Sequence, residues 1–288
     1  MAQHVAVVTD SSACVPAELA RDWGVTVVPL QITLGGRARA EGDPGLGREV
    51  VEAVDSGTQA TTSQPNLAAC LEAFHSAAQG ADAIVAITLS EKMSGTVGTM
   101  RRAAQEASVP VTVIDSRTVS LGLGFAALSA AAVAREGADA EVVAREAERV
   151  ARSALVLFTV ETLTHLRKGG RVSPAVAAVG SALNIRPLLG VVDGEVAVAE
   201  RVRTAARCRQ ALLDRLASRA PALRSPAIGL VTLDGDEAFA ADARAVLARR
   251  GTWPVLSAEL SAVLGVHTGP GTLGGIVADV HPEVAASL

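Results

Sequence analysis

Residues Ala83–Ala107 read AIVAITLSEKMSGTVGTMRRAAQEA, and the order of segments within them indicates the fold class. The first six residues, up to Thr88, form a short apolar run that ends in a polar loop, which is typical of a buried strand. The loop Leu89–Thr96 is rich in hydroxyl groups, and the segment Thr96–Ala107 is expected to form a helix. A strand, a loop and a helix in this order predict part of an α/β fold.

The same alternation extends to both sides of this stretch. Repeated strand and helix units predict a mostly parallel sheet covered by helices, here an N-terminal three-layer domain. Ligands of such sheets bind at the carboxyl ends of the strands. The expected strands are His4–Thr9, Val25–Leu34 and Pro110–Ile114, and the expected helices are Asn66–Gln79, Leu121–Arg135 and Ala140–Ser153.

The second half of the chain has a different pattern. Strand-like segments at Leu183–Val192 and Glu195–Arg203 are joined by Asp193-Gly194, a strong hairpin signal. We therefore expect a C-terminal α/β domain with a mixed or antiparallel sheet, and place the boundary near Ser153, giving domains 1–153 and 154–288. Its other expected elements are strands at Leu155–Val160, Ile228–Leu233 and Val255–Glu259 and helices at Glu161–Arg167, Ala205–Arg219 and Glu237–Arg250.

Composition excludes several classes of function. The 288 residues are 49% hydrophobic but only 2% aromatic, so the interior must be built from aliphatic side chains. The net charge of −4 and the scarcity of aromatic faces argue against binding of nucleic acid. Three widely spaced cysteines predict neither a disulfide framework nor a metal site. No secretory leader or membrane span is recognisable, so we expect a cytoplasmic protein.

Two hydroxyl-rich segments, Thr61–Asn66 and Leu89–Thr96, each directly precede an expected helix. Backbone N–H groups at a helix N-terminus, together with neutral hydroxyl donors, suit a small anion such as a carboxylate. The alternative interpretation is that Thr62 and Ser94 merely cap these helices, since serine and threonine are common at such positions.

Several short motifs, in order along nearly the whole chain, resemble the DegV family, the fatty-acid-binding subunits of bacterial fatty acid kinase. The resemblance implies a two-domain α/β protein that buries one long-chain fatty acid between its domains and needs no other cofactor. It also implies a separate ATP-dependent kinase subunit that phosphorylates the fatty acid carboxylate to an acyl phosphate. The motifs are VTDS at Val8–Ser11, TSQP at Thr62–Pro65, Leu89–Thr96, IDS at Ile114–Ser116, LTHLRKGGRVS at Leu163–Ser173, IRPLL at Ile185–Leu189, VRT at Val202–Thr204 and HTGPG at His267–Gly271.

The resemblance also implies roles for particular residues. Thr62 and Ser94 would contact the carboxylate, with help from the backbone amide of Gly95. Arg203 and His267, from the second half, would lie near the headgroup and support phosphoryl transfer. Peripheral contact with a membrane during lipid exchange is a further expectation.

Other interpretations of the same residues stay open at this stage. A stand-alone enzyme acting on a small phosphorylated or carboxylated metabolite could use Asp10, Asp115 or His267 as acid or base, although for the two aspartates the Asp-Ser dipeptides favour turns instead. A regulatory protein could use the bound lipid only as a signal. The cations around Gly169-Gly170, in Arg167–Arg171, fit either a partner surface or the C-terminus of a helix.

Overall fold

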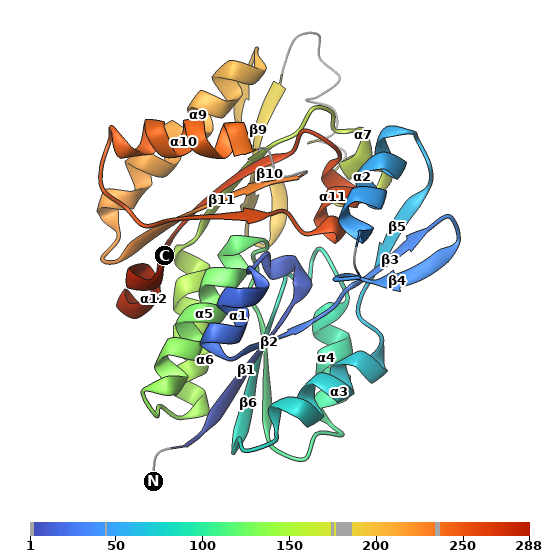
Figure 1. Ribbon diagram of the computed structural model, residues 1–288, viewed down its shortest axis with the longest axis vertical. Coiled ribbons are helices and arrows are strands. Elements are labelled where there is room, and N and C mark those ends of the chain that lie inside the picture. The colour runs from blue at the N-terminus through green and yellow to red at the C-terminus, as the bar shows by residue number, and fades with distance from the viewer. Residues whose placement is uncertain (1–2, 44, 174–175, 177–185, 234–236) are drawn as a thin grey trace.

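A computed structural model describes residues 3–43, 45–173, 176, 186–233 and 237–288 (Figure 1). The described strands form three sheets, called A, B and C below. The expected α/β class, with a parallel N-terminal sheet and a mixed C-terminal sheet, is confirmed. No helix in the described ranges is long and apolar enough to cross a membrane.

Sheet A is the parallel sheet predicted from the first half of the chain. Its strand order is β2-β1-β6-β7, and every neighbouring pair is parallel, so all carboxyl ends lie at one edge. The strands are β1 (Val5–Asp10), β2 (Val25–Val28), β6 (Ala83–Thr88) and β7 (Val111–Asp115). The helices of this half that cover it are α1 (Ala17–Trp23), α3 (Leu67–Ala77), α4 (Thr96–Ala104), α5 (Leu121–Arg135) and α6 (Ala140–Ser153), with a short 3-10 turn at Ser11–Ala13.

Sheet C contains strands from the second half in the order β10-β9-β8-β13-β11-β12, and among its described strand pairs only β11–β12 is parallel. The predicted hairpin turn is present, since Asp193 and Gly194 both have positive φ, at 49° and 82°. The strands are β8 (Leu155–Thr159), β9 (Arg186–Val192), β10 (Glu195–Val202), β11 (Pro226–Thr232), β12 (Val255–Glu259) and β13 (Leu273–Asp279). Helices α9 (Ala205–Arg219), α10 (Glu237–Ala248) and α12 (Pro282–Ser287) and a 3-10 turn at Ala220–Ala222 complete this half.

The elements stack in layers, visible in Figure 1. Helices α3 and α4 cover one face of sheet A, α5 and α6 lie between sheets A and C, and α9 and α10 cover the outer face of sheet C. Helix α5 is buried at every residue from Leu121 to Ala134, as expected of a helix that is apolar on all sides. Its first turn packs closely against sheet C, because a Cβ on Gly229 of β11 would lie 2.6 Å from Leu121 Cδ1.

Sheet B was missed by the sequence analysis. The expected single strand Val25–Leu34 is wrong, because Pro29 separates β2 in sheet A from β3 (Gln31–Leu34) in sheet B. Strand β3 pairs antiparallel with β4 (Arg37–Ala40) and β5 (Ala60–Ser63), and α2 (Leu46–Asp55) connects those two. Thr61, Thr62 and Ser63 therefore lie in a strand and not in a loop before a helix.

Helix α11 (Ala262–Thr268) was also missed, and it packs against α2, β5 and α7 (Thr164–Lys168). His267 consequently lies in the last turn of a helix that the sequence did not predict. The division into domains at Ser153 stays a prediction, and residues 183–185 of the expected strand Leu183–Val192 lie outside the described residues.

Candidate functional site

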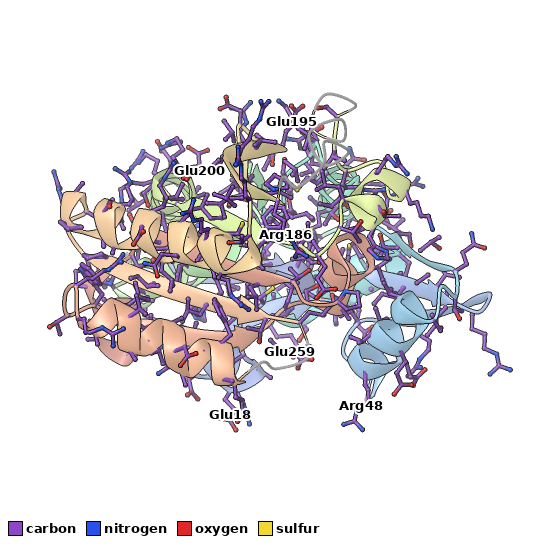
Figure 2. The ribbon with its side chains drawn as sticks, turned by 90° about the horizontal axis from the view of Figure 1, so that it is seen from above. Glu18, Arg48, Arg186, Glu195, Glu200 and Glu259 are labelled. Carbon is purple, nitrogen blue, oxygen red and sulfur yellow. The ribbon has the colours of Figure 1, made fainter. Side chains whose placement is uncertain are left out.

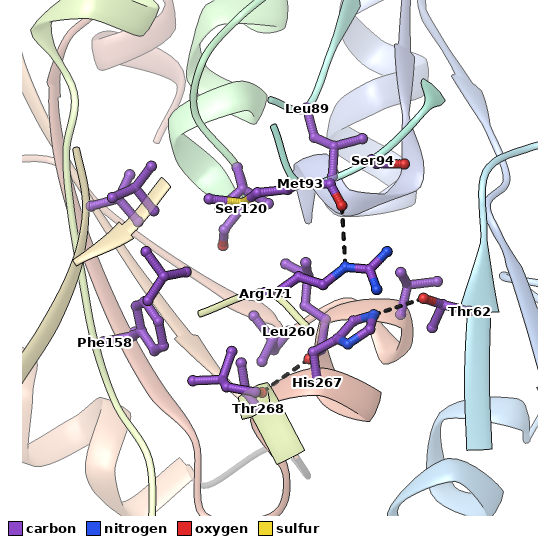
Figure 3. A pocket seen from close by; sticks show the side chains of 18 of the residues that line it. Thr62, Leu89, Met93, Ser94, Ser120, Phe158, Arg171, Leu260, His267 and Thr268 are labelled. Carbon is purple, nitrogen blue, oxygen red and sulfur yellow. Dashed lines mark hydrogen bonds between the residues drawn. The ribbon is translucent and has the colours of Figure 1, made fainter. Parts of the chain in front are cut away.

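A cavity of about 320 Å³ lies between sheet C and the loops at the carboxyl end of sheet A, and sheet B and α11 close it on one side (Figure 3). This volume is within the roughly 300–1,000 Å³ common for small-molecule sites. Most of the lining side chains are aliphatic. The apolar lining residues are Leu30, Leu89, Met93, Val119, Val156, Leu157, Phe158, Leu166, Val191, Val196, Val231, Leu260, Val263, Leu264 and Ile276.

Polar side chains also line this cavity, and Figure 3 shows that Thr62, Ser94, Arg171 and His267 lie toward one side of it while Ser120 lies apart from them. Thr62 from β5 and His267 from α11 meet there, with 2.7 Å between Thr62 Oγ1 and His267 Nε2. Ser94 and Gly95, in the loop between β6 and α4, line the same cavity. The structure thus brings together four of the five residues singled out from the sequence, although they come from three different parts of the fold.

His267 is electrically neutral at pH 7 in this setting. Burial lowers the pKa of its imidazole to about 4, and the positive charge of Arg171 contributes to the same shift. Its Nδ1 is buried and has no hydrogen-bond partner among the described residues. That nitrogen faces Gly169, where a Cβ would lie only 2.3 Å away. Gly169, the first glycine of the motif LTHLRKGGRVS, is therefore needed to make room for the imidazole ring.

The unpartnered Nδ1 favours one tautomer of His267. With the proton on Nε2, Nδ1 buries only a lone pair, whereas the other tautomer would bury an N–H group without an acceptor. Buried N–H groups without acceptors are rarer than under-satisfied acceptors, so we assign the proton to Nε2. His267 then donates to Thr62 Oγ1, and the hydroxyl hydrogen of Thr62 can point toward a ligand.

The position of Ser94 is compatible with both interpretations considered from the sequence. Its Oγ accepts a hydrogen bond from the backbone N–H of Thr96 at 3.3 Å, in the first turn of α4, and it still lines the cavity. For Thr62 the capping interpretation is wrong, because Asn66 caps α3 by accepting from the N–H of Ala69 at 2.7 Å. Gly95 approaches the segment after β5 closely, since a Cβ there would lie 1.9 Å from Gln64 Oε1.

The cations are distributed differently from the prediction. Arg203 is exposed one residue beyond β10 and is not among the residues that line the cavity. Arg171, for which the sequence left two interpretations open, does line it, and its Nε–H donates to the backbone oxygen of Met93 at 3.2 Å. The only sequence signal near Arg171 was the preceding glycine pair. Two glycines indicate an unusual backbone path, but they do not predict that the Arg171 side chain reaches the cavity.

A second, outer pocket of about 380 Å³ lies on the other side of the Thr62–His267 pair, and both residues line it as well. Lys168, Arg171 and His165 also contribute to its lining, together with Thr58 and Thr61 of the β5 region. The Thr62–His267 hydrogen bond is thus part of the wall between an aliphatic cavity and a pocket with cationic side chains.

The two aspartates considered for acid–base chemistry hold loops in place. Asp10 accepts from the N–H and hydroxyl of Ser12 and from the N–H of Leu89, and burial raises its pKa to about 6. Asp115 accepts from the backbone N–H groups of Glu91 and Arg117. Neither aspartate lines the cavity. In the part of the chain that the structure describes, no cluster of His, Cys, Asp and Glu suits a metal ion.

Comparison with known proteins adds to this geometry. The family model described as an uncharacterised protein of the DegV family matches residues 4–279. The chain belongs to the DegV family. A DegV domain-containing protein of Streptomyces coelicolor is 39% identical over 284 residues, which cover 96% of this chain and 99% of that protein.

Solved structures of DegV proteins share the whole architecture. A DegV family protein from Thermus thermophilus, described by its fatty acid binding, is 35% identical with a TM-score of 0.88, and the match covers 96% of this chain and 100% of that one. DegV from Bacillus subtilis, described as a fatty acid binding protein, is 26% identical with a TM-score of 0.87 over 96% and 99% of the two chains.

Proposed function

We propose that this DegV protein binds one long-chain fatty acid, with the carboxylate at Thr62, Ser94 and the backbone N–H of Gly95 and the acyl chain along the aliphatic cavity. The observation that carries the proposal is a mostly apolar cavity with Thr62, Ser94 and Gly95 on one side of it, where a neutral His267 contacts Thr62. The descriptions of the Thermus thermophilus and Bacillus subtilis relatives as fatty acid binding proteins support it.

Burial of the acyl chain supplies most of the binding free energy in this proposal. At about 0.8 kcal/mol per methylene, a chain of about 15 carbons gives an upper bound of about 12 kcal/mol before association costs. Hydrogen bonds from neutral hydroxyl and amide groups then mainly orient the carboxylate. Because they form no tight salt bridge, a carboxylate oxygen keeps enough electron density to attack a phosphorus atom.

We further propose that the protein presents this carboxylate to a separate ATP-dependent kinase subunit in the bacterial cytoplasm, which converts it to an acyl phosphate. Two features favour this over catalysis by the chain alone. The sequence contains no G-x-x-x-x-G-K-[ST] phosphate loop. The outer pocket, with Lys168 and Arg171 in its lining, shares Thr62 and His267 with the cavity and suits the negative charge of a phosphoryl group.

The alternative of a stand-alone enzyme for a small metabolite has less support. Asp10 and Asp115 bind backbone amides and do not line the cavity, and His267 has no carboxylate partner within the described residues. An aliphatic cavity also offers a hydrophilic metabolite few hydrogen bonds. The regulatory interpretation requires the same lipid site and differs only in what happens after binding.

Native mass spectrometry of the gently purified protein tests the proposal. The expected result is an added mass equal to that of one fatty acid, which a denaturing spectrum of the same sample lacks. Thin-layer analysis of an organic extract should recover the same lipid. Retention of a hydrophilic metabolite, or failure to take up added fatty acid after delipidation, would contradict the lipid site.

A further inference from the structure

Helix α11, which carries His267, is capped by a residue from a distant part of the chain. Ser261 occupies the position before the helix, but its side chain makes no capping hydrogen bond. Instead, the N–H of Val263 donates to Glu41 Oε1 at 3.1 Å, and the hydroxyl of Ser261 donates to the same oxygen at 2.8 Å. A carboxylate here satisfies an N–H group of the first turn and interacts favourably with the helix dipole.

The other oxygen of Glu41 reaches the carboxyl end of β1. Glu41 Oε2 accepts a hydrogen bond from the hydroxyl of Ser11, and Ser11 Oγ in turn accepts from the N–H of Leu30 at 3.0 Å. The backbone N–H of Glu41 donates to the oxygen of Leu30 at 2.8 Å. Leu30 lines the aliphatic cavity. One half-buried carboxylate therefore joins sheet A, sheet B and α11 beside the cavity wall.

Sheet B holds α11 at both of its ends. Glu41 directly follows β4 and binds the first turn of the helix, while Thr62 in β5 binds His267 in the last turn. A helix of seven residues is only about 10 Å long, at about 1.5 Å per residue. Because so few residues separate its two ends, a shift at its first turn would reach His267 in the last turn.

We propose that Glu41 is a positioning residue for the fatty acid site. Its carboxylate fixes α11 on sheet B so that His267 Nε2 meets Thr62 Oγ1, although Glu41 is not among the residues that line the cavity. The proposal rests on the proposed function only in that the Thr62–His267 pair is taken as the carboxylate end of the site.

Three variants separate positioning from a general loss of charge. Glu41→Ala removes all three side-chain hydrogen bonds, whereas Glu41→Gln keeps one oxygen for Ser261 and Val263. Glu259→Ala is the matched control, because Glu259 is an exposed acid at the end of β12 that lines the same open cleft as Glu41 and Arg48. Figure 2 shows Glu259 and Arg48 on one side of the molecule.

The first measurement is the rate at which oleate leaves the loaded protein. Loss of the cap and of its charge should speed release about tenfold in Glu41→Ala, with substantial rescue in Glu41→Gln and no change in Glu259→Ala. Ser261→Ala removes only one of the bonds and should give a smaller change in the same direction, so the proposal can still be tested if Glu41→Ala does not fold. Equal release rates in the unaltered chain, Glu41→Ala and Ser261→Ala would overturn it.

The second measurement follows His267 directly in lipid-free protein. The ring nitrogen signals of His267, assigned by their loss in His267→Gln, should move in an ¹⁵N NMR spectrum of Glu41→Ala and stay in place in Glu259→Ala. Unmoved signals in Glu41→Ala would overturn positioning even if the melting temperature fell. If the unaltered chain binds no oleate, the proposed function fails, while these spectra still decide the role of Glu41.

Discussion

At the scale of single residues, the site depends on the contact between Thr62 and His267. A charged imidazole would bind a carboxylate as a salt bridge, but burial keeps this ring neutral at pH 7. The ring can therefore act only by orienting the hydroxyl group of Thr62 through a hydrogen bond. The Nε2 proton occupies an acceptor position on Thr62 and leaves the threonine hydrogen for the ligand. Ser94, whose oxygen accepts the N–H of Thr96, can likewise donate its own hydrogen into the cavity.

Removing either hydroxyl should weaken fatty acid binding without unfolding the protein. Thr62→Val keeps the shape of the side chain and a residue suited to β5, and Ser94→Ala removes one oxygen. Each loses a hydrogen bond to a charged group, which is worth about 1.5–3 kcal/mol of binding free energy. Displacement of a fluorescent fatty acid measures the change. Thr61→Val is the control, because Thr61 lies in the same strand but lines only the outer pocket. Unchanged affinity in both test variants would show that the carboxylate lies elsewhere.

The depressed pKa of His267 makes a prediction about pH. Between its ordinary pKa of 6.5 and its folded-state pKa of about 4, the unfolded chain binds a proton that the native protein excludes. The free energy of unfolding must therefore fall as the pH is lowered through this window. In the absence of lipid, the free energy of unfolding of the unaltered protein exceeds that of His267→Gln by an amount that should fall by at most about 3 kcal/mol from pH 6.5 to 4. Urea unfolding of both proteins measures it, and the opposite contribution of Asp10 cancels in the difference. A constant difference would mean that the imidazole is not buried as described.

The sequence identified the hydroxyl groups of the site better than its cations. Thr62, Ser94, Gly95 and His267 lie in short motifs whose family resemblance assigned them to one place, and they do line one cavity. Arg203 lies in an equally recognisable motif but points to no part of that cavity, because β10 ends at Val202 and the chain turns into α9. The distance between two loops depends on how the sheets pack against each other, and a local sequence pattern does not predict that packing.

At the scale of elements, the predicted units are those with a strong local period or a turn signal. Helices α5 and α6 have the predicted bounds, and the Asp193-Gly194 hairpin has the predicted turn. Sheet B was missed because β4 (RARA) and β5 (ATTS) are only four residues long and contain no large apolar residue that identifies a buried face. Helix α11 was missed because it is only seven residues long and contains Gly265.

The hairpin between β9 and β10 should stabilise the loop that contains Ser94. The hydroxyl of Ser90 donates to the backbone oxygen of Gly194 at 2.7 Å, and a Cβ on Gly194 would lie 2.4 Å from Ser90 Oγ. We expect Gly194→Ala to lower the free energy of unfolding by about 1–3 kcal/mol more than Gly80→Ala. Gly80 is the matched control, because it also has positive φ but a Cβ on it would meet no described atom within 4 Å. Equal losses in urea unfolding would show that the contact with Ser90 has no energetic role.

At the scale of the whole molecule, the layers place the cavity between two sheets that belong to the two halves of the chain. Sheet A presents the carboxyl ends of its strands, sheet C supplies the aliphatic wall, and sheet B with α11 closes the side where the outer pocket lies. In the proposed binding mode, the carboxylate would lie beside the outer pocket and the acyl chain along the apolar lining. A fatty acid in this orientation would be held by one part of the protein and approached by a partner from another.

Arg203 tests this separation between holding the lipid and meeting the kinase. It is exposed and does not line the cavity, so Arg203→Ala should retain the fatty acid fully while slowing acyl phosphate formation with the cognate kinase subunit. Loss of a guanidinium that contacts a partner or phosphate should lower the rate about tenfold or more. Arg219→Ala, at the exposed other end of α9, is the control and should change neither quantity. His267→Ala, in contrast, should lose lipid as well as turnover, because its ring binds Thr62. Lipid occupancy and turnover measured in the same preparations decide the matter: if Arg203→Ala loses both in proportion, Arg203 supports the lipid site or the fold, and the kinase approaches another surface.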